Sequence, residues 1–599
     1  LAVMLGDACS TSSADALFTS ALKFFAASQC LLGEPWPDTA AVHNGSYFDF
    51  IIVGAGTAGS TLAARLAEVP NFTVLLVEAG GYPPKEAIIP GLRDTLKASS
   101  YDWNFTTVND CFSSQGLDTG RQVQPRGKML GGSGSINDMV YARGRPEDYE
   151  EWADIVGNTW NWTNILDYFK KTERMTDERI INNDELMSYH GTDGEIEVSG
   201  RLDIDEDIQR ILEGFEELGV KIVDDLSYPN EIGAGRFSHT ISNGKRASSL
   251  TALLNKVHTD NLYVLPSTYV TRILIDEKGK AMGIRAVMNE EEIMFYADKE
   301  VIVSAGTFNT PKLLMLSGIG PKDHLETLGI PVIRDLPVGD NLHDHIMVIN
   351  YLVINNGTCA VNDSSQYFQI MKYLYDSSGT LSYSDSAGVY LPKVGEDPGI
   401  PYFAIYPTCV PRSDISLDGC MNVLGYDKEV CQKIIKANEK EELISLAVVH
   451  LKPQSRGAVR LNSTDPLMNP LIYSGLFHND TDFDGYLEAI NFALSLASTK
   501  YFKAQNARVL DYSYDRCKGR DLKRCLIQDY AMPAWHAVGT TAMGSVVNSH
   551  LQVLGISNLR VVDAGVMPNI IRGNTNAVVV MIAEKAADFI KSAHGISFP

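Results

Sequence analysis

The stretch that decides the fold is Phe48-Asp49-Phe50-Ile51-Ile52-Val53-Gly54-Ala55-Gly56-Thr57-Ala58-Gly59. It is an apolar strand that runs directly into Gly-x-Gly-x-x-Gly. Residues 60–68 continue with a helix-like pattern, and Thr73–Val77 predicts a second apolar strand that ends on Glu78. A strand, a glycine turn, a helix and an acid at the tip of the second strand form a whole βαβ unit. This unit predicts a dinucleotide-binding fold of the Rossmann type.

The glycines and the acid of this unit each have a physical reason. Gly54 permits the tight turn, Gly56 lets the backbone approach a pyrophosphate, and Gly59 lets the helix pack close to the strand. The helix N-terminus then offers N–H groups and its positive dipole end to the phosphates. Glu78 is expected to accept hydrogen bonds from the ribose hydroxyls of an adenosine. A carboxylate there argues against a ribose that carries a 2′-phosphate.

Composition excludes several classes of protein. The 599 residues, of which 45% are apolar, are enough for two or more domains or one large two-lobed enzyme. The net charge of −23 would repel nucleic acid and anionic membranes, so no nucleic-acid partner is expected. No apolar run approaches the roughly 18 residues of a membrane span. The chain begins at Leu1 with no visible signal-peptide pattern, so either a signal peptide was removed or none was present.

Sequons and cysteines favour a secreted protein. Asn-x-Ser/Thr occurs at eight positions: Asn44, Asn71, Asn104, Asn161, Asn356, Asn362, Asn462 and Asn479. Of the nine cysteines, Cys517 and Cys525 flank a short polar loop that could hold a disulfide, and the region of Cys409, Cys420 and Cys431 could hold another. The odd count leaves at least one thiol free or paired to another molecule. No zinc-type spacing is present, so no metal is expected.

Further glycine-containing stretches follow in the chain. GKMLGGSGSIN at 127–137 has five small residues in a row, which lets a flat ligand approach and exposes N–H donors. GTFNTP at 306–311 follows a predicted strand, and we place a helix start at its Thr310-Pro311. Near the end come HAVGT at 536–540, Asp563-Ala564 after a predicted strand, and GNTNA at 573–577.

With these blocks in this order, the chain resembles the glucose–methanol–choline (GMC) family of flavoprotein alcohol oxidoreductases, from about residue 45 to about residue 595. It is most similar to the insect branch, which includes glucose dehydrogenases, glucose oxidases, ecdysone oxidases and aryl-alcohol oxidases. The resemblance implies FAD as the cofactor and an α/β fold. A discontinuous Rossmann-like FAD domain would carry an inserted α+β substrate domain built on an antiparallel sheet.

The resemblance also implies where FAD binds. The first glycine unit and Glu78 would hold the adenosine half, the loop around Asn137 would contact the isoalloxazine, and Val270 would contact the adenine end through its backbone. Asp563 and Ala564 would lie near the pyrophosphate and ribityl chain. A helix beginning at Ala577 would face the flavin, where its N-terminus stabilises anionic reduced flavin. The full expected set is Gly54, Ala55, Gly56, Thr57, Gly59, Glu78, Gly132, Ser133, Asn137, Val270, Asp563, Ala564 and Ala577.

His536 matches the family's catalytic histidine. A neutral imidazole suits the removal of a hydroxyl proton while a hydride passes to flavin N5. The second member of the pair is His in some relatives and Asn in others. Between Asn574 and Asn576 we choose Asn576, because it directly precedes the predicted helix. An amide there positions the alcohol oxygen without competing for the proton.

Other residues have alternative interpretations. Ile136 stands where some relatives tether FAD through a histidine, so FAD is expected to be non-covalent. His343 and His345 look like a metal pair, but their segment resembles a family framework motif, and we interpret them as structural hydrogen-bonding residues. Trp535 packs either over the flavin or substrate or into the aromatic core.

The expected domains alternate along the chain. An N-terminal arm spans 1–46, the FAD domain comprises 47–150, 235–345 and 525–599, and the substrate domain comprises 151–234 and 346–524. The expected reaction is oxidation of an alcohol such as glucose, an ecdysteroid or an aryl alcohol, with oxygen or a quinone-type carrier as the final acceptor. The alternatives are a flavin-containing hydroxynitrile lyase and a secreted member that binds FAD without turnover. Which alcohol reacts and the oligomeric state stay open.

Overall fold

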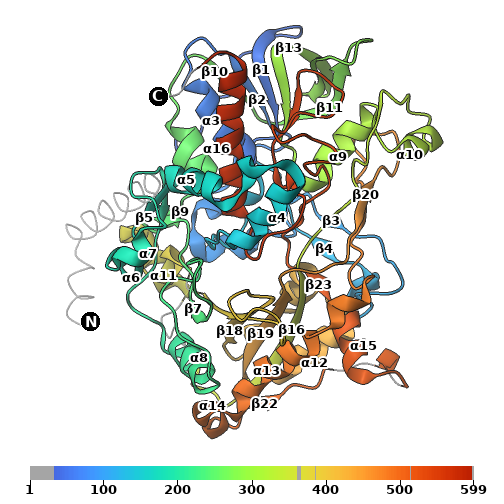
Figure 1. Ribbon diagram of the computed structural model, residues 1–599. Helices are drawn as coiled ribbons and strands as arrows, with labels where there is room; N and C mark the ends of the chain where they lie inside the picture. Colours follow the sequence, from blue (N-terminus) through green and yellow to red (C-terminus); the bar gives the residue numbers. More distant parts are fainter. Residues whose placement is uncertain (1–32, 360–365, 385, 513–514, 518, 597–599) are drawn as a thin grey trace, which may run out of the picture.

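The computed structural model describes residues 33–359, 366–384, 386–512, 515–517 and 519–596. Most of the expected N-terminal arm at 1–46 therefore lies outside the described residues. Figure 1 shows two lobes, each organised around its own sheet. Both the mixed architecture and its discontinuity agree with the expected α/β fold.

The first lobe contains a seven-stranded sheet assembled from three separated parts of the chain. Four strands run parallel to one another, a fifth, β24, is parallel to β13, and the hairpin β11–β12 extends the other edge antiparallel. The spatial order is β10 (Leu262–Leu265), β2 (Val74–Val77), β1 (Tyr47–Val53), β13 (Glu291–Val303), β12 (Ala281–Met288) and β11 (Thr268–Ile275), with β24 (Leu559–Val561) beside β13.

The βαβ unit forms as the sequence predicts. Ile51 and Ile52 of β1 are fully buried, because helices cover a parallel sheet on both faces and its strands need apolar residues throughout. Helix α3 (Thr57–Ala67) follows the glycine turn and lies beside the C-terminal helix α16 (Asn576–Ala593) (Figure 1). A Cβ added to Gly59 would lie 1.9 Å from the Gly54 carbonyl oxygen, so the tight turn requires glycine there.

Helix α9 (Gly306–Leu316) corrects one expectation. The helix begins at Gly306, so Pro311 lies inside it and not at its start. A proline has no N–H to donate to the carbonyl four residues earlier. The Thr307 carbonyl instead accepts a hydrogen bond of 2.7 Å from Thr540 Oγ1. This contact from a distant segment is what permits an internal proline, and local sequence rules do not reveal it.

The second lobe contains an antiparallel seven-stranded sheet, as expected for the substrate domain. Its order is β22 (Arg508–Val509), β16 (Ile346–Ile354), β19 (Glu442–His450), β18 (Phe403–Val410), β17 (Ala387–Leu391) and β7 (Ala234–Arg236), with β23 (Met532–Pro533) beside β16. Helices α8 (Glu206–Glu217), α12 (Lys428–Asn438), α13 (Tyr486–Leu494) and α15 (Leu522–Asp529) belong to this lobe in Figure 1.

The lobes do not divide where the sequence placed the boundaries. β23 pairs with the second sheet although the segment from 525 onward was expected in the FAD domain, and β7 extends across the expected boundary after 234. Conversely, α4 (Pro146–Val156) and α5 (Trp162–Thr172) carry Trp152 and Ile165 into the core of the first lobe. Strand pairing between distant segments determines which residues belong to each lobe. The composition along the chain does not reveal this pairing.

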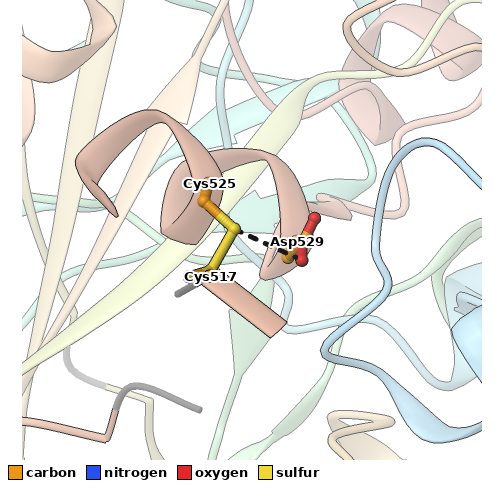
Figure 2. A group of neighbouring side chains, drawn as sticks. All are labelled: Cys517, Cys525 and Asp529. Atoms are coloured by element: carbon orange, nitrogen blue, oxygen red, sulfur yellow. Dashed lines mark hydrogen bonds between the residues drawn. A yellow bond between two sulfur atoms is a disulfide. The ribbon is translucent and has the colours of Figure 1, made fainter. Parts of the chain in front are cut away.

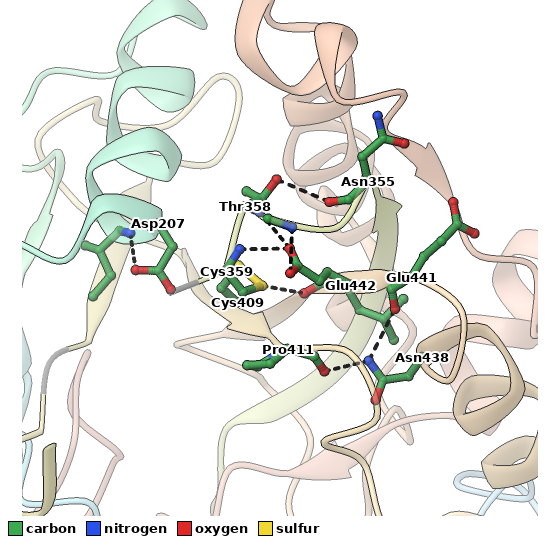
Figure 3. The surroundings of a disulfide bond; sticks show 12 residues. Asp207, Asn355, Thr358, Cys359, Cys409, Pro411, Asn438, Glu441 and Glu442 are labelled. Atoms are coloured by element: carbon green, nitrogen blue, oxygen red, sulfur yellow. Dashed lines mark hydrogen bonds between the residues drawn. A yellow bond between two sulfur atoms is a disulfide. The ribbon is translucent and has the colours of Figure 1, made fainter. Parts of the chain in front are cut away.

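Three disulfides brace the second lobe. Cys517–Cys525 and Cys420–Cys431 lie in the two regions that the sequence singled out. The third, Cys359–Cys409, joins residues 50 apart (Figure 3). Beside it, Glu442 Oε2 accepts hydrogen bonds of 2.8 Å from the backbone N–H groups of both Thr358 and Cys359. Cys111 is free and exposed, and Cys9 and Cys30 lie outside the described residues.

Asp529 lies beside the Cys517–Cys525 bridge, and the three side chains form a cluster of metal-ligand types (Figure 2). The two sulfur atoms are bonded to each other, so neither offers the thiolate that a metal requires.

Among the described residues, no helix has the length and apolar character needed to cross a membrane.

A buried ion network ties the loops on one side of the first lobe together. The His190 ring lies between two carboxylates, with Nδ1 2.7 Å from Glu173 and Nε2 3.0 Å from Asp225. Arg143 forms an ion pair with the same Glu173. Although burial and Arg143 oppose it, the two carboxylates raise the pKa of His190 above its usual value. The network therefore favours the imidazolium form of His190.

Candidate active site

One cavity brings together most of the residues that the sequence predicted. It extends from the C-terminal ends of β1 and β2 to the segment around His536. Ala55, Gly59 and Ala577 are not part of its lining. The predicted residues that line it are Gly54, Gly56, Thr57, Glu78, Gly132, Ser133, Asn137, Val270, His536, Asp563, Ala564 and Asn576.

Two glycine-rich loops meet at the N-terminus of α3. Gly132 has a φ of +52°, and a Cβ added to it would lie 2.7 Å from Gly56 Cα. At Gly54, with a φ of +99°, a Cβ would lie 2.5 Å from the Ser304 carbonyl oxygen. Side chains are therefore excluded at Gly54 and Gly132, and the backbone of both loops can approach a ligand beside the helix N-terminus. Such a cradle suits a pyrophosphate.

Glu78 is anchored at the end of β2. Its Oε2 accepts a hydrogen bond of 2.9 Å from the Ala55 N–H, and its Oε1 accepts one of 2.8 Å from the Gly80 N–H. Burial raises the pKa of Glu78 to about 7, although these N–H donors oppose the shift. Each carboxylate oxygen keeps a further lone pair for a ligand hydroxyl. This is the geometry expected of an acid that binds a ribose.

Several polar atoms of the cavity lining have no partner within the described part of the chain. Ser304 Oγ, Asn309 Oδ1 and Asn574 Oδ1 are buried and make no hydrogen bond there. Leaving a buried polar atom unpaired costs about 1–3 kcal/mol. A polar ligand that fills the cavity would supply these hydrogen bonds. The backbone cradle, Glu78 and the unpaired atoms together fit FAD.

A chain of three side chains lies at the other end of the cavity. His345 Nδ1 is 2.9 Å from His536 Nδ1, and Asn574 Nδ2 is 3.0 Å from His536 Nε2. The second ring nitrogen of His345, Nε2, is 2.9 Å from the Ile571 carbonyl oxygen. These contacts join segments that are up to 226 residues apart in the sequence.

The Ile571 carbonyl at the end of this chain determines which ring nitrogens of the two histidines carry hydrogen. Because the Ile571 oxygen only accepts, His345 Nε2 carries a hydrogen, and Nδ1 of a neutral His345 is an acceptor. His536 must therefore donate from its own Nδ1. Its Nε2 is left with a lone pair, to which the Asn574 amide donates. The arrangement thus presents the basic nitrogen of His536 on the side of Asn574.

Electrostatics keep both imidazoles neutral. Burial lowers the pKa of His345 to about 3. Burial, together with the neighbouring His345 and Arg126, lowers the pKa of His536 well below its usual value. Near neutral pH, His536 is therefore unprotonated at Nε2 and able to accept a proton.

The backbone around His536 is fixed by Asp344. One carboxylate oxygen, Oδ1, accepts hydrogen bonds from the His345 N–H at 2.8 Å and from the His536 N–H at 2.9 Å. The preceding residue, Trp535, has a φ of +63°, which is unusual for a bulky side chain. Its indole N–H donates to the Val123 carbonyl at 3.1 Å, and its ring lines the cavity beneath Lys97 Nζ. Trp535 therefore faces the cavity and is not a core residue.

The expected pairing of His536 with Asn576 differs from the structure. Asn576 is the first residue of α16, and its Oδ1 accepts a hydrogen bond of 3.0 Å from Thr57 Oγ1 at the start of α3. Asn574 lies two residues earlier, before the helix begins, and its side chain reaches the imidazole. Proximity to the helix start was the wrong criterion, because the first helical residue turns toward the neighbouring helix.

The two histidines of the framework motif have different roles. His343 donates from Nε2 to the Pro453 carbonyl at 2.8 Å and accepts at Nδ1 from the Ile570 N–H at 3.1 Å. Both of its nitrogens are occupied by backbone groups, in agreement with the structural interpretation. His345, which received the same interpretation, instead contacts His536. Two residues apart on an extended segment, the side chains of His343 and His345 are expected on the same side. The sequence carries no signal that His345 would contact His536.

Comparisons with known proteins identify the family of the chain. Family models described as GMC oxidoreductase match residues 48–347 and 453–583. The chain is 56% identical to an ecdysone oxidase of Bombyx mori, over 98% of this chain and 88% of that protein. It is also 56% identical to an ecdysone oxidase of Spodoptera littoralis, over 96% of each chain. A Drosophila melanogaster glucose dehydrogenase [FAD, quinone] is 33% identical over 97% of this chain and 93% of its own.

Among solved structures, a formate oxidase superposes with a TM-score of 0.80 at 29% identity, covering 92% of this chain and 99% of that chain. The resemblance seen in the sequence motifs is thereby confirmed, and so are the α/β fold and the FAD cofactor. The lyase and the non-catalytic alternatives are not favoured. The chain belongs to the GMC oxidoreductase family, and it is an FAD-dependent enzyme that oxidises an alcohol.

Proposed function

We propose that the protein is an ecdysteroid oxidase. The observation that carries the proposal is the 56% identity to two ecdysone oxidases over nearly the whole chain. The glucose dehydrogenase relative is far less similar, at 33%. Since both of the more similar relatives are named oxidases, oxygen is the proposed electron acceptor.

His536 is the proposed base. Bound FAD supplies the hydride acceptor. The alcohol enters between the cofactor cradle and the imidazole, and its hydroxyl donates its proton to His536 Nε2. When the alcohol binds, its hydroxyl takes the place of Asn574 as the hydrogen-bond partner of that nitrogen, and Asn574 Nδ2, which lies 3.0 Å from it here, donates to the alcohol oxygen and orients it. His345 accepts from His536 Nδ1 and so fixes the tautomer that leaves Nε2 basic.

The cofactor is proposed to bind without a covalent bond to the small-residue loop. Ile136, at the position where some relatives carry a histidine, lines the cavity and offers no nucleophile. Secretion and glycosylation are proposed as well. Three disulfides support an oxidising compartment. Six sequons have exposed asparagines: Asn44, Asn71, Asn104, Asn356, Asn462 and Asn479.

The test is anaerobic reduction of the bound flavin, followed at about 450 nm, with ecdysone, glucose and benzyl alcohol in separate experiments. Ecdysone is expected to bleach the flavin with the highest rate constant per molar substrate, and air is expected to restore the colour. Bleaching by glucose but not by ecdysone would reject the steroid substrate. Bleaching by ecdysone without reoxidation in air would reject oxygen as the acceptor and retain the substrate.

A further inference from the structure

Arg246 is a buried cation that the proposed mechanism does not use. It lies in the short strand β9 (Lys245–Arg246), and only 3% of its surface is exposed. Within the described residues it forms no ion pair with a carboxylate, and its Nη2 is buried without a hydrogen-bond partner. Buried charges in proteins are ordinarily paired, so an unpaired one requires a reason.

The partners of the guanidinium come from two segments beside the cavity. Nε donates to the Ala87 carbonyl at 2.8 Å. Nη1 donates to Asn137 Oδ1 at 2.6 Å and to the Gly134 carbonyl at 3.2 Å. Asn137 lines the cavity, and Gly134 belongs to the small-residue loop that meets α3. Arg246 therefore supports the cofactor loop from behind, and only one residue separates its charge from the cavity.

The positive charge persists at neutral pH. Burial lowers the pKa of the Arg246 guanidinium to about 9, and the carboxylate of Asp138 opposes that shift. Even so lowered, the side chain is protonated in the physiological range. The Asp138 carboxylate offsets part of this charge, but a buried cation without a carboxylate in direct contact acts on a nearby anion more strongly than a solvated cation does.

We propose that Arg246 is a positioning residue with a second, electrostatic role: it holds the Gly134–Asn137 loop against FAD and stabilises the anionic, two-electron-reduced cofactor relative to the oxidised one. It thereby raises the reduction potential of the bound flavin. This inference concerns the cofactor alone and holds whichever alcohol is the substrate.

The two roles are separable by thermodynamic linkage. A residue that only holds the loop changes the dissociation constants of oxidised and reduced FAD by the same factor, and the potential of the bound flavin stays the same. A residue that favours the reduced anion changes their ratio, and the potential moves by that ratio. A change in the reduction potential of the bound flavin therefore indicates the electrostatic role, because a purely structural role leaves that potential unchanged.

The experiment compares Arg246→Gln, which keeps an amide donor but loses the charge, with Arg246→Lys, which keeps the charge. The midpoint potential of each FAD-loaded protein is measured by equilibration with a reference dye during reduction by dithionite, so both electrons come from the reagent and no alcohol is present. Removing a unit charge from a poorly polarisable surrounding near the cofactor is expected to lower the two-electron equilibrium constant roughly tenfold in Arg246→Gln. A tenfold fall corresponds to about 30 mV for a two-electron couple.

Arg236→Gln is the matched control. Arg236 is also a buried arginine that donates to backbone carbonyls, those of Asp203 and Leu202, but it lies in β7 and not in the cavity lining. The flavin potential of Arg236→Gln is expected to equal that of the wild type. The potential of Arg246→Lys is expected to be closer to the wild-type value than the potential of Arg246→Gln. Equal potentials in Arg246→Lys and Arg246→Gln would overturn the proposal, and so would a wild-type potential in Arg246→Gln. If Arg246→Gln does not retain FAD, the potential of Arg246→Lys decides. A wild-type potential in Arg246→Lys supports the charge role. A potential lowered by about 30 mV, which corresponds to a tenfold fall of the equilibrium constant, contradicts it.

Discussion

Replacing His345 by leucine tests the proton arrangement that the structure assigns to His536. The substitution removes the acceptor of the His536 Nδ1–H, which lies 2.9 Å from His345 Nδ1, and leaves the base itself in place. A buried donor without a partner costs about 1–3 kcal/mol. The imidazole escapes that cost by moving its proton to Nε2, and then the nitrogen that faces Asn574 is no longer basic.

The expected loss follows from that cost. At about 1.4 kcal/mol per tenfold in rate, His345→Leu should slow flavin reduction roughly ten- to hundredfold. His536→Ala, which removes the base, should slow it by about 10²–10⁴-fold. The rate of flavin reduction by the alcohol is measured anaerobically by stopped flow on FAD-loaded protein, so that later steps with the acceptor do not contribute.

The pH profile gives a second, independent readout. His536 must be neutral to accept a proton, so the rate falls as pH drops through its pKa. Burial, then the neighbouring His345, lowers that pKa well below the usual value, and in the wild type the acid limb should lie well below pH 6.5. Without His345 one of the lowering contributions is lost, and the acid limb should move to higher pH.

His343→Gln is the matched control for both readouts. His343 belongs to the same motif and is buried, but its two ring nitrogens hydrogen-bond to the backbone of Pro453 and Ile570. The control should lower thermal stability and leave the pH profile of flavin reduction unchanged in the protein that retains FAD. Wild-type rates and an unmoved acid limb in His345→Leu would refute the tautomer argument.

Three further predictions concern other residues of the chain. Asn574→Ala should slow flavin reduction about tenfold, the value of one hydrogen bond, while Asn576→Ala should chiefly weaken FAD binding; a larger kinetic effect at Asn576 would restore the pairing inferred from the sequence. Glu78→Ala should raise the dissociation constant of FAD at least tenfold in a fluorescence titration, and an unchanged constant would mean that this acid does not bind the ribose. The pKa of His190 is raised in the folded protein, so its contribution to stability is complete below about pH 6.5 and is lost as pH rises through the folded pKa. The melting temperature of the wild type should therefore decline over that pH range, and the melting temperature of His190→Gln should not. Melting temperatures of the two proteins that change in parallel with pH would contradict this prediction.

Local sequence was sufficient for the cofactor half of the molecule. The run from Phe48 to Gly59 encodes its own strand, turn and helix, because apolar continuity and glycine placement act over neighbouring residues. Glu78 was predictable for the same reason, since it ends the next strand of the same unit. The proposed base, His536, was identified only through the resemblance of all the sequence blocks to the GMC family, because residues 536–540 alone would also suit a structural histidine.

The partners of that base were decided by tertiary structure. His345 and His536 are 191 residues apart and Asn574 is 38 residues further on, so no local rule orients these rings toward one another. Asn574 and Asn576 are chemically identical and two positions apart, and what separates their roles is where α16 begins and that Thr57 lies beside its first residue. The sequence by itself thus determines which chemical groups are present and which cofactor they fit. The tertiary structure determines which amide and which imidazole meet His536, because side-chain direction depends on packing between distant segments.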